Sequence, residues 1–354
     1  MSDPTLAKGE RAEELLRLYF LLSGYYVVRG ARLAFDDDDV TDVDLWLYMR
    51  PSPLGRERIN VDAKYKNKPK ALERVLWAKG LQSVLGCDRS IVATTDKRPQ
   101  VRRFAERHGV LVLDGHFLKR LEVSRTQGAN ARLDEEALDG ILAKCGQNSS
   151  LVRRRVAYSK SRLLSQLSFD SCNRWLDDLK FLLELLPNAQ ASMGAQRALY
   201  VVASHFLIGL DFVLAQVAFE EPETRRSFLE NGFRYGAGGR QRLDDSLKFA
   251  FGLLDAFAPG TGGAFSRARS SVTAELEALN VSVLADHFSR AEVSKELFSL
   301  ARGLEALGYS EKFTPLSALP PNSIGLFGVL ADHFDLDRIQ VLGTPGGEDR
   351  GEGV

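Results

Sequence analysis

The chain has 354 residues, 44% of them hydrophobic, and its 47 lysine and arginine residues balance 47 aspartate and glutamate residues. This length suffices for two domains, each with a sizeable core, and the composition is that of an ordinary globular protein. Three widely spaced cysteines, without a CxxC pair or a Cys/His cluster, argue against a disulfide framework and against a zinc site. The first residues lack the basic and apolar regions of a secretory signal, so we expect a cytoplasmic protein.

The first helix is predicted from apolar residues at helical spacing, followed by Gly24 as a stop: Ala12, Leu15, Leu16, Tyr19 and Phe20. Strands are predicted over residues 25–29, 43–50 and 59–64, separated by an acidic loop at 36–39 and a proline-containing turn at 51–55. A helix over 71–85, a strand over 90–94, a helix over 99–108 and a strand over 110–113 follow. The order is α-β-β-β-α-β-α-β. Because crossover helices join the later strands, we expect a mixed sheet flanked by helices.

The remainder of the chain is predicted to be helical. Residues 124–130 are polar and without periodicity, and helices are expected over 151–167, 175–186, 196–219, 240–257, 264–280 and 290–307. We therefore expect an α/β domain at 1–123, a linker at 124–134, an all-α helical domain at 135–342 and a flexible tail at 343–354.

Residues 198–219 are apolar and about long enough to cross a bilayer. This segment contains Asp211, and an aspartate near the middle of a span costs roughly 2.5 to 3.5 kcal/mol on insertion scales. Neighbouring amphipathic helices also need a partner to cover their apolar faces. We therefore predict a buried helix of a bundle and no membrane association.

Two acids and a lysine are the strongest chemical signal in the chain. Asp62 and Lys64 are two positions apart on a predicted strand, so both emerge on one face, and Asp44 lies on the preceding strand. Two carboxylates that converge on a hard cation, beside a lysine, suit metal-assisted phosphodiester hydrolysis. Asp42 shares the strand face of Asp44 and is a rival ligand.

The motifs Gly9-Glu10-Arg11-Ala12-Glu13, Ser23-Gly24-Tyr25-Tyr26-Val27, Asp42-Val43-Asp44-Leu45 and Asp62-Ala63-Lys64 resemble the PD-(D/E)xK nuclease superfamily. The resemblance is greatest to Mrr-type restriction endonucleases, and residues 90–114 match the way that group closes its core. It covers about residues 6 to 122. It implies a restriction-endonuclease-like fold and hydrolysis that leaves a 5′-phosphate and a 3′-hydroxyl.

The resemblance also implies a role for each residue. Asp44 and Asp62 would hold Mg²⁺, for which Mn²⁺ can substitute, together with the Ala63 carbonyl. Lys64 would orient or help deprotonate the attacking water and offset charge in the transition state. Glu13 would hold a second ion or a water in the shell of the first, with Glu10 and Glu14 as rivals. The catalytic set is therefore Glu13, Asp44, Asp62 and Lys64.

Basic residues that follow the site strand are candidates for nucleic-acid contacts: Lys66, Lys68, Lys70 and Arg74. Gln82, on the next helix, is a further candidate, although an exposed helix glutamine is an equally open interpretation. Residues 1–125 hold 23 lysine and arginine residues against 18 acids, an excess of +5, and the remainder has an excess of −5. The basic excess lies where a polyanion would approach the site.

From the sequence we predict a Mg²⁺-dependent endonuclease that hydrolyses DNA, and family analogy suggests defence against foreign DNA. Two alternatives stay open: a nuclease acting on RNA or branched DNA, and a non-catalytic nucleic-acid-binding module attached to a helical interaction domain. The helical domain is expected to serve recognition, regulation or oligomerisation, with a homodimer or a partner protein both open.

Overall fold

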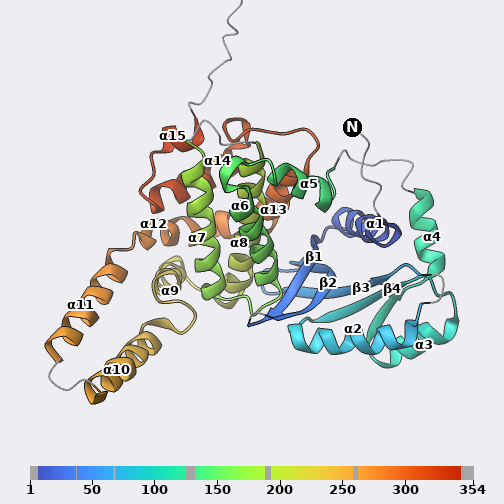
Figure 1. Ribbon diagram of the computed structural model, residues 1–354, viewed down its shortest axis with the longest axis horizontal. Coiled ribbons are helices and arrows are strands. Elements are labelled where there is room, and N and C mark those ends of the chain that lie inside the picture. The colour runs from blue at the N-terminus through green and yellow to red at the C-terminus, as the bar shows by residue number, and fades with distance from the viewer. Residues whose placement is uncertain are drawn as a thin grey trace, which may run out of the picture.

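The computed structural model describes residues 7–36, 38–66, 69–124, 132–187, 193–257 and 262–343 (Figure 1). The expected linker at 124–134 therefore lies largely outside the described residues, as does almost all of the expected tail at 343–354. The N-terminal part contains α1 (Lys8–Leu22), β1 (Tyr26–Phe35), β2 (Asp38–Met49), β3 (Glu57–Lys64), α2 (Ala71–Leu85), β4 (Arg89–Thr94), α3 (Pro99–Arg107), β5 (Val110–Leu113) and α4 (Gly115–Ser124). The expected order of elements is confirmed, and α4 is an addition to it.

The five strands form one sheet in the order β1-β2-β3-β4-β5. β1, β2 and β3 pair antiparallel, whereas β3 pairs parallel to β4 and β4 parallel to β5. The expectation of a mixed sheet with flanking helices is therefore confirmed. The carboxyl ends of β3, β4 and β5 meet at one edge of the sheet, where ligands commonly bind in α/β proteins.

The acidic stretch at 36–39 differs from its prediction as a loop. β2 begins at Asp38, and Asp39 pairs with Ala34 of β1, so the hairpin is longer than expected. Asp36 adopts a left-handed φ of 52°, which aspartate tolerates better than most residues. Arg32, whose Nη1 lies 3.7 Å from an Asp39 carboxylate oxygen, offsets part of the negative charge along the hairpin.

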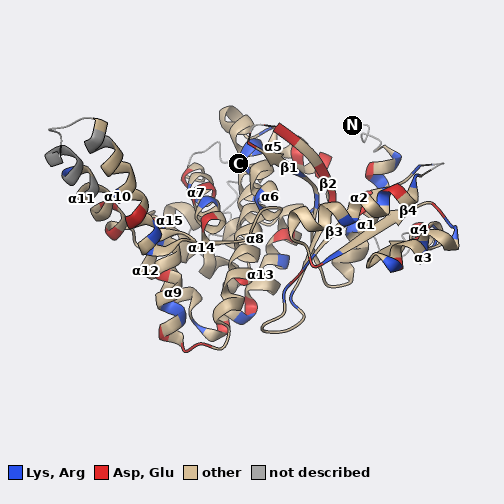
Figure 2. Ribbon diagram, turned by 90° about the horizontal axis from the view of Figure 1, so that it is seen from below, with Lys and Arg blue, Asp and Glu red and all other residues tan. Residues whose placement is uncertain are grey.

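Helices make up the rest of the described chain, as expected. They are α5 (Glu135–Leu142), α6 (Ser149–Leu163), α7 (Phe169–Leu185), α8 (Met193–Leu214), α9 (Pro222–Tyr235), α10 (Gly239–Phe257), α11 (Gly262–Ala278), α12 (Val281–Phe288), α13 (Ala291–Tyr309), α14 (Pro321–His333) and α15 (Arg338–Leu342). Short 3₁₀ turns occur at η2 (Gly146–Asn148), η3 (Ala215–Val217) and η4 (Leu316–Ala318). α10 and α11 extend away from the remainder in Figures 1 and 2.

Side-chain alternation along the strands divides the core around the sheet. Leu45 and Val61 pack with α1 and α4 on one face, and Val92 packs with α2 and α3 on the other. At the β1–β2 end, Tyr26, Trp46 and Tyr48 belong to the same apolar cluster as the helices around α8. The helical part therefore completes one face of the sheet rather than standing apart from it.

α8 is the central helix of this bundle. Together with η3 it is the one described helix whose length and mean hydropathy of 1.9 would suffice for a membrane span, and 89% of that window is buried in the protein. Asp211, near its carboxyl end, accepts hydrogen bonds from Tyr48 and Arg50 on the β2 side. The one buried carboxylate among the described residues of this helix thus finds its partners on the sheet side.

His205 provides a test of this packing. It is 2% exposed, with Nδ1 2.6 Å from the Ser159 hydroxyl, and burial lowers its pKa to about 3, helped by the charge of Lys160. Between pH 6.5 and 3 the unfolded chain therefore binds a proton that the folded chain does not. The free energy of unfolding should fall as the pH falls through this window.

We expect wild-type protein to lose about 2 kcal/mol more stability between pH 7.5 and 5 than His205→Gln loses. Urea unfolding of both proteins at the two pH values measures the difference. Equal losses in the two proteins would show that His205 is not held neutral by the fold.

Candidate active site

The carboxyl end of β3 carries the residues that the sequence singled out. Asn60 and Asp62 face α2, because Asn60 donates to the Ala78 carbonyl and Asp62 accepts from Arg74, whereas Ile59, Val61 and Ala63 pack on the opposite face. This alternation is the one predicted from the strand pattern. Lys64 ends the strand and is about one-third exposed.

Asp44 of β2 lies next to this edge, because its side chain contacts the end of β3. The β2–β3 ladder ends at the Leu45–Val61 pair, and beyond it the Asp44 Oδ2 atom accepts a hydrogen bond of 2.7 Å from the Ala63 backbone N–H. The same oxygen lies 3.4 Å from Lys64 Nζ. In an antiparallel pair the N–H and C=O of one residue face the same neighbour, so the Ala63 carbonyl also faces the side of Asp44.

Asp62 is 5% exposed, and its charge is compensated by a single guanidinium. Arg74, from the first turns of α2, donates from Nε to Oδ2 over 2.7 Å and from Nη2 to Oδ1. Burial lowers the pKa of Arg74, and the negative charge of the nearby Asp44 acts in the opposite direction. Arg74, predicted as a nucleic-acid contact, thus forms an ion pair with a site carboxylate.

Glu13 enters from α1. Burial raises the pKa of Glu13, the Asp44 carboxylate raises it further, and Arg29 and Lys64 act in the opposite direction. Glu13 therefore shares an electrostatic environment with Asp44 and Lys64. Of its two rivals, Glu10 accepts from the Ala7 N–H at the helix start, and Glu14 pairs with Arg17 and Arg29.

Arg29 is the site neighbour that the sequence did not reveal. It is 4% exposed on β1 and donates to Glu13 at 3.0 Å, to Glu14 at 3.0 Å and to both oxygens of Glu136 at 2.9 Å. Glu136 belongs to α5, so this guanidinium connects the candidate site to the helical part. An arginine between Val28 and Gly30 in an apolar strand was the only signal for it.

Other predicted residues are distributed around this centre. Asp42 is exposed, and its Oδ1 lies 3.9 Å from Arg32 Nε. Lys70 forms an exposed ion pair with Glu73, Lys66 lines an adjacent cavity, and Lys68 lies outside the described residues. The structure does not bring Gln82 to the site, because it lies eight residues beyond Arg74 on α2, roughly 12 Å along the axis, and donates to the Asp88 carbonyl.

The donor set suits magnesium better than a metal held wholly by protein. Within the described ranges, no three His, Cys, Asp or Glu side chains gather as a complete cage. Mg²⁺ is typically held by one or two carboxylates, with waters and phosphate oxygens filling the octahedron. Oδ1 of Asp44 accepts no hydrogen bond from the described residues, and the Asp44 carboxylate raises the pKa of Glu13, so the two negative charges repel each other. A cation there would relieve that repulsion.

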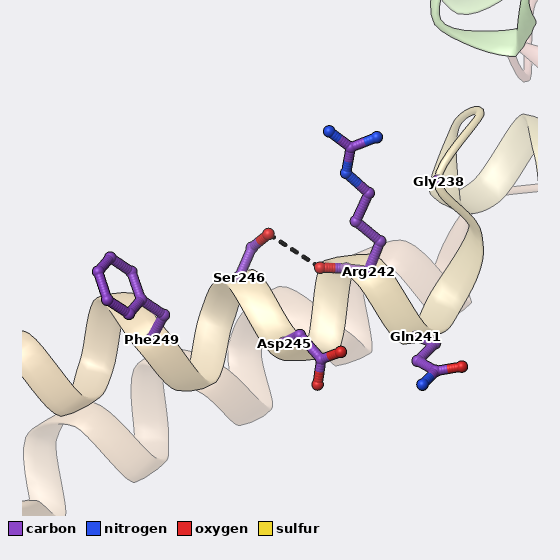
Figure 3. A pocket seen from close by; sticks show the side chains of 6 residues that line it. All are labelled: Gly238, Gln241, Arg242, Asp245, Ser246 and Phe249. Carbon is purple, nitrogen blue, oxygen red and sulfur yellow. Dashed lines mark hydrogen bonds between the residues drawn. The ribbon is translucent and has the colours of Figure 1, made fainter.

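Hollows elsewhere on the molecule also carry charge, and one of about 670 Å³ between α5 and α6 is lined by three carboxylates and a lysine: Glu135, Glu136, Asp139 and Lys160. Another of about 500 Å³ lies along α10, lined by Gly238, Gln241, Arg242, Asp245, Ser246 and Phe249, and holds a single carboxylate (Figure 3). Figure 2 shows acidic residues along the β1–β2 hairpin and charges of both signs scattered over the helices. Charge alone therefore does not identify a second site.

Comparisons of the chain with protein-family models, with curated proteins and with solved structures found no match.

The Arg74–Asp62 ion pair allows a specific expectation for metal binding. Arg74 occupies both oxygens of Asp62, so a cation has to share or displace it. Arg74→Leu should therefore tighten Mg²⁺ binding about tenfold, which corresponds to ~1.4 kcal/mol. Titration calorimetry of the full chain measures the affinity for Mg²⁺. Arg102→Leu is the control, because Arg102, which lies on α3, forms an ion pair with Asp114. Weaker binding by Arg74→Leu would contradict this competition.

Proposed function

We propose that the chain is a Mg²⁺-dependent nuclease that hydrolyses phosphodiester bonds of DNA, with a restriction-endonuclease-like fold in its N-terminal part. The observation that carries the proposal is the meeting of Asp44, Asp62 and Lys64 at one edge of the sheet, from two strands. Glu13 of α1 is electrostatically coupled to the same place. The choice of DNA over RNA rests on the resemblance to Mrr-type enzymes.

Each residue has a role that follows from its position. Asp44 and Asp62 would hold the cation with the Ala63 carbonyl, and Glu13 would orient a water beside them. The bound cation supplies Lewis acidity and lowers the pKa of water. Lys64, on the solvent side of Asp44, orients the attacking water and places its positive charge near the phosphate oxygens. The water oxygen would bond to phosphorus and release a proton to solvent, the bond to the 3′ oxygen would break, and that oxygen would take a proton from solvent.

The test is a cleavage assay with purified full chain. Supercoiled plasmid, linear duplex and single-stranded RNA are each incubated with Mg²⁺, Mn²⁺ or EDTA. We expect cutting of DNA with either metal, none with EDTA, and none by Asp62→Ala or Lys64→Ala. Thermal melting of each variant establishes that it is folded.

Two other results would redirect the proposal. Cutting of RNA alone, lost in the same variants, would make the chain a ribonuclease with this site. DNA binding without cutting under any metal would favour a non-catalytic module, in which Arg74 permanently neutralises Asp62.

A further inference from the structure

A cavity of about 370 Å³ opens at the carboxyl edge of the parallel strands, beside the candidate site. Its walls come from the segments that follow β3, β4 and β5. Each segment contributes one lysine: Lys66, Lys97 and Lys119 respectively, and the wall between them includes Leu118. At ~30 Å³ per water molecule, the cavity has room for about twelve waters, enough for a hydrated anionic group.

Among the described residues that line the cavity, three lysines and one glutamate leave a net positive charge. Lys66, Lys97 and Lys119 form no ion pair with any of the residues the structure describes. The one acid in the wall, Glu122, accepts a hydrogen bond from the Tyr65 hydroxyl. Three like charges around one space repel each other, so an anion bound between them would lower the electrostatic energy.

The backbone that carries these lysines is held in place. The Thr95 hydroxyl donates to the Lys66 carbonyl at 2.5 Å, and the Gly115 N–H donates to the Asp96 carbonyl at 3.0 Å. A Cβ atom at position 115 would lie 2.3 Å from the Thr95 carbonyl oxygen, so only glycine permits this approach. The three segments therefore form a preorganised cavity rather than three independent loops.

We propose that this cavity binds a phosphate group of the nucleic-acid strand that occupies the active site, an inference that rests on the proposed function. Lys66 is two residues beyond Lys64, at most roughly 7 Å along the chain. The phosphate is therefore a close neighbour of the scissile one. It belongs either to the continuous backbone or to a strand end that carries a 5′-phosphate.

The test compares two triple variants of the full chain. Lys66→Ala/Lys97→Ala/Lys119→Ala removes the cavity charge, and Lys144→Ala/Lys295→Ala/Lys312→Ala removes the same charge from exposed lysines elsewhere. Fluorescence anisotropy in EDTA measures binding to a short duplex with and without 5′-phosphate, between about 50 and 200 mM salt. We expect the cavity variant to bind at least about tenfold more weakly, with a salt slope smaller by about 0.9, and the control to keep the wild-type slope.

The outcomes separate the two claims. Equal losses on both duplexes assign a backbone phosphate, and a loss confined to the phosphorylated duplex assigns a strand end. If the cavity and control variants bind DNA equally well and the wild-type protein cuts DNA, the phosphate-binding role of the cavity is overturned and the proposed nuclease function is not. If the cavity variant alone loses DNA binding and the wild-type protein never cuts DNA, the phosphate-binding role of the cavity stands and the proposed nuclease function is overturned. If the wild-type protein binds neither duplex, the phosphate-binding role of the cavity is also overturned.

Discussion

Asp44→Asn is expected to reduce Mg²⁺-dependent cleavage of plasmid DNA about a thousandfold, or ~4 kcal/mol in the activation free energy. Asparagine keeps the shape of the side chain and can still accept the hydrogen bond from the Ala63 N–H. It lacks the negative charge that would hold a divalent cation and that faces Lys64 at 3.4 Å. The rate of plasmid nicking under saturating Mg²⁺ measures the effect.

Asp42→Asn is the matched control, because it makes the same chemical change two positions away on the same strand. Asp42 is exposed and approaches only Arg32, so its replacement should leave the cleavage rate within about twofold of wild type. Comparable losses in the two variants would mean that Asp42 contributes to the site in solution. A large loss in Asp42→Asn alone would exchange the roles of the two aspartates.

The second large effect is on stability. Asp211 is fully buried on α8 and accepts hydrogen bonds from Arg50 at 2.8 Å, Arg56 at 3.0 Å and Tyr48 at 2.6 Å. Asp211→Ala leaves two largely buried guanidinium groups without their counter-charge. We expect the free energy of unfolding to fall by about 3 to 5 kcal/mol, measured by urea denaturation.

An exposed ion pair supplies the comparison for this variant. Asp139 pairs with Arg153 on the surface, where both side chains are about half exposed, so Asp139→Ala should change stability by at most about 0.5 kcal/mol. A loss below about 1 kcal/mol in Asp211→Ala would show that the sheet and helical part do not depend on this ion cluster.

The features that could be predicted from sequence are those set by local pattern. The bounds of α2 agree with the prediction at both ends, because its apolar residues recur at helical spacing and Gly86 adopts the left-handed conformation that ends the helix. Strand alternation likewise placed Asp62 and Lys64 together on β3. α4 was missed although its start carries a local signal, Asp114, whose side chain accepts hydrogen bonds from the backbone N–H groups of His116 and Phe117.

The features that could not be predicted depend on contacts between distant segments. No local pattern indicates that Arg74 would engage Asp62, or that Arg29 would bridge α1 and α5. Gln82 was considered from its position in the sequence, but the axis of α2 carries it away from the catalytic edge. The grouping of three lysines around one cavity likewise requires the parallel order of β3, β4 and β5.

The anchoring of α1 has a consequence for the timing of synthesis. Arg17 of α1 is 1% exposed and donates to Glu305 of α13 at 3.0 Å across 288 residues of sequence. At translation rates of roughly 5 to 20 residues per second, Glu305 is made about 15 to 60 s after Arg17. During this interval a nascent chain contains all four candidate catalytic residues but lacks the contact between α13 and α1, the helix that carries Glu13. Under the proposed function, ribosome-bound chains stalled before Glu305 should therefore show less nuclease activity than the full chain.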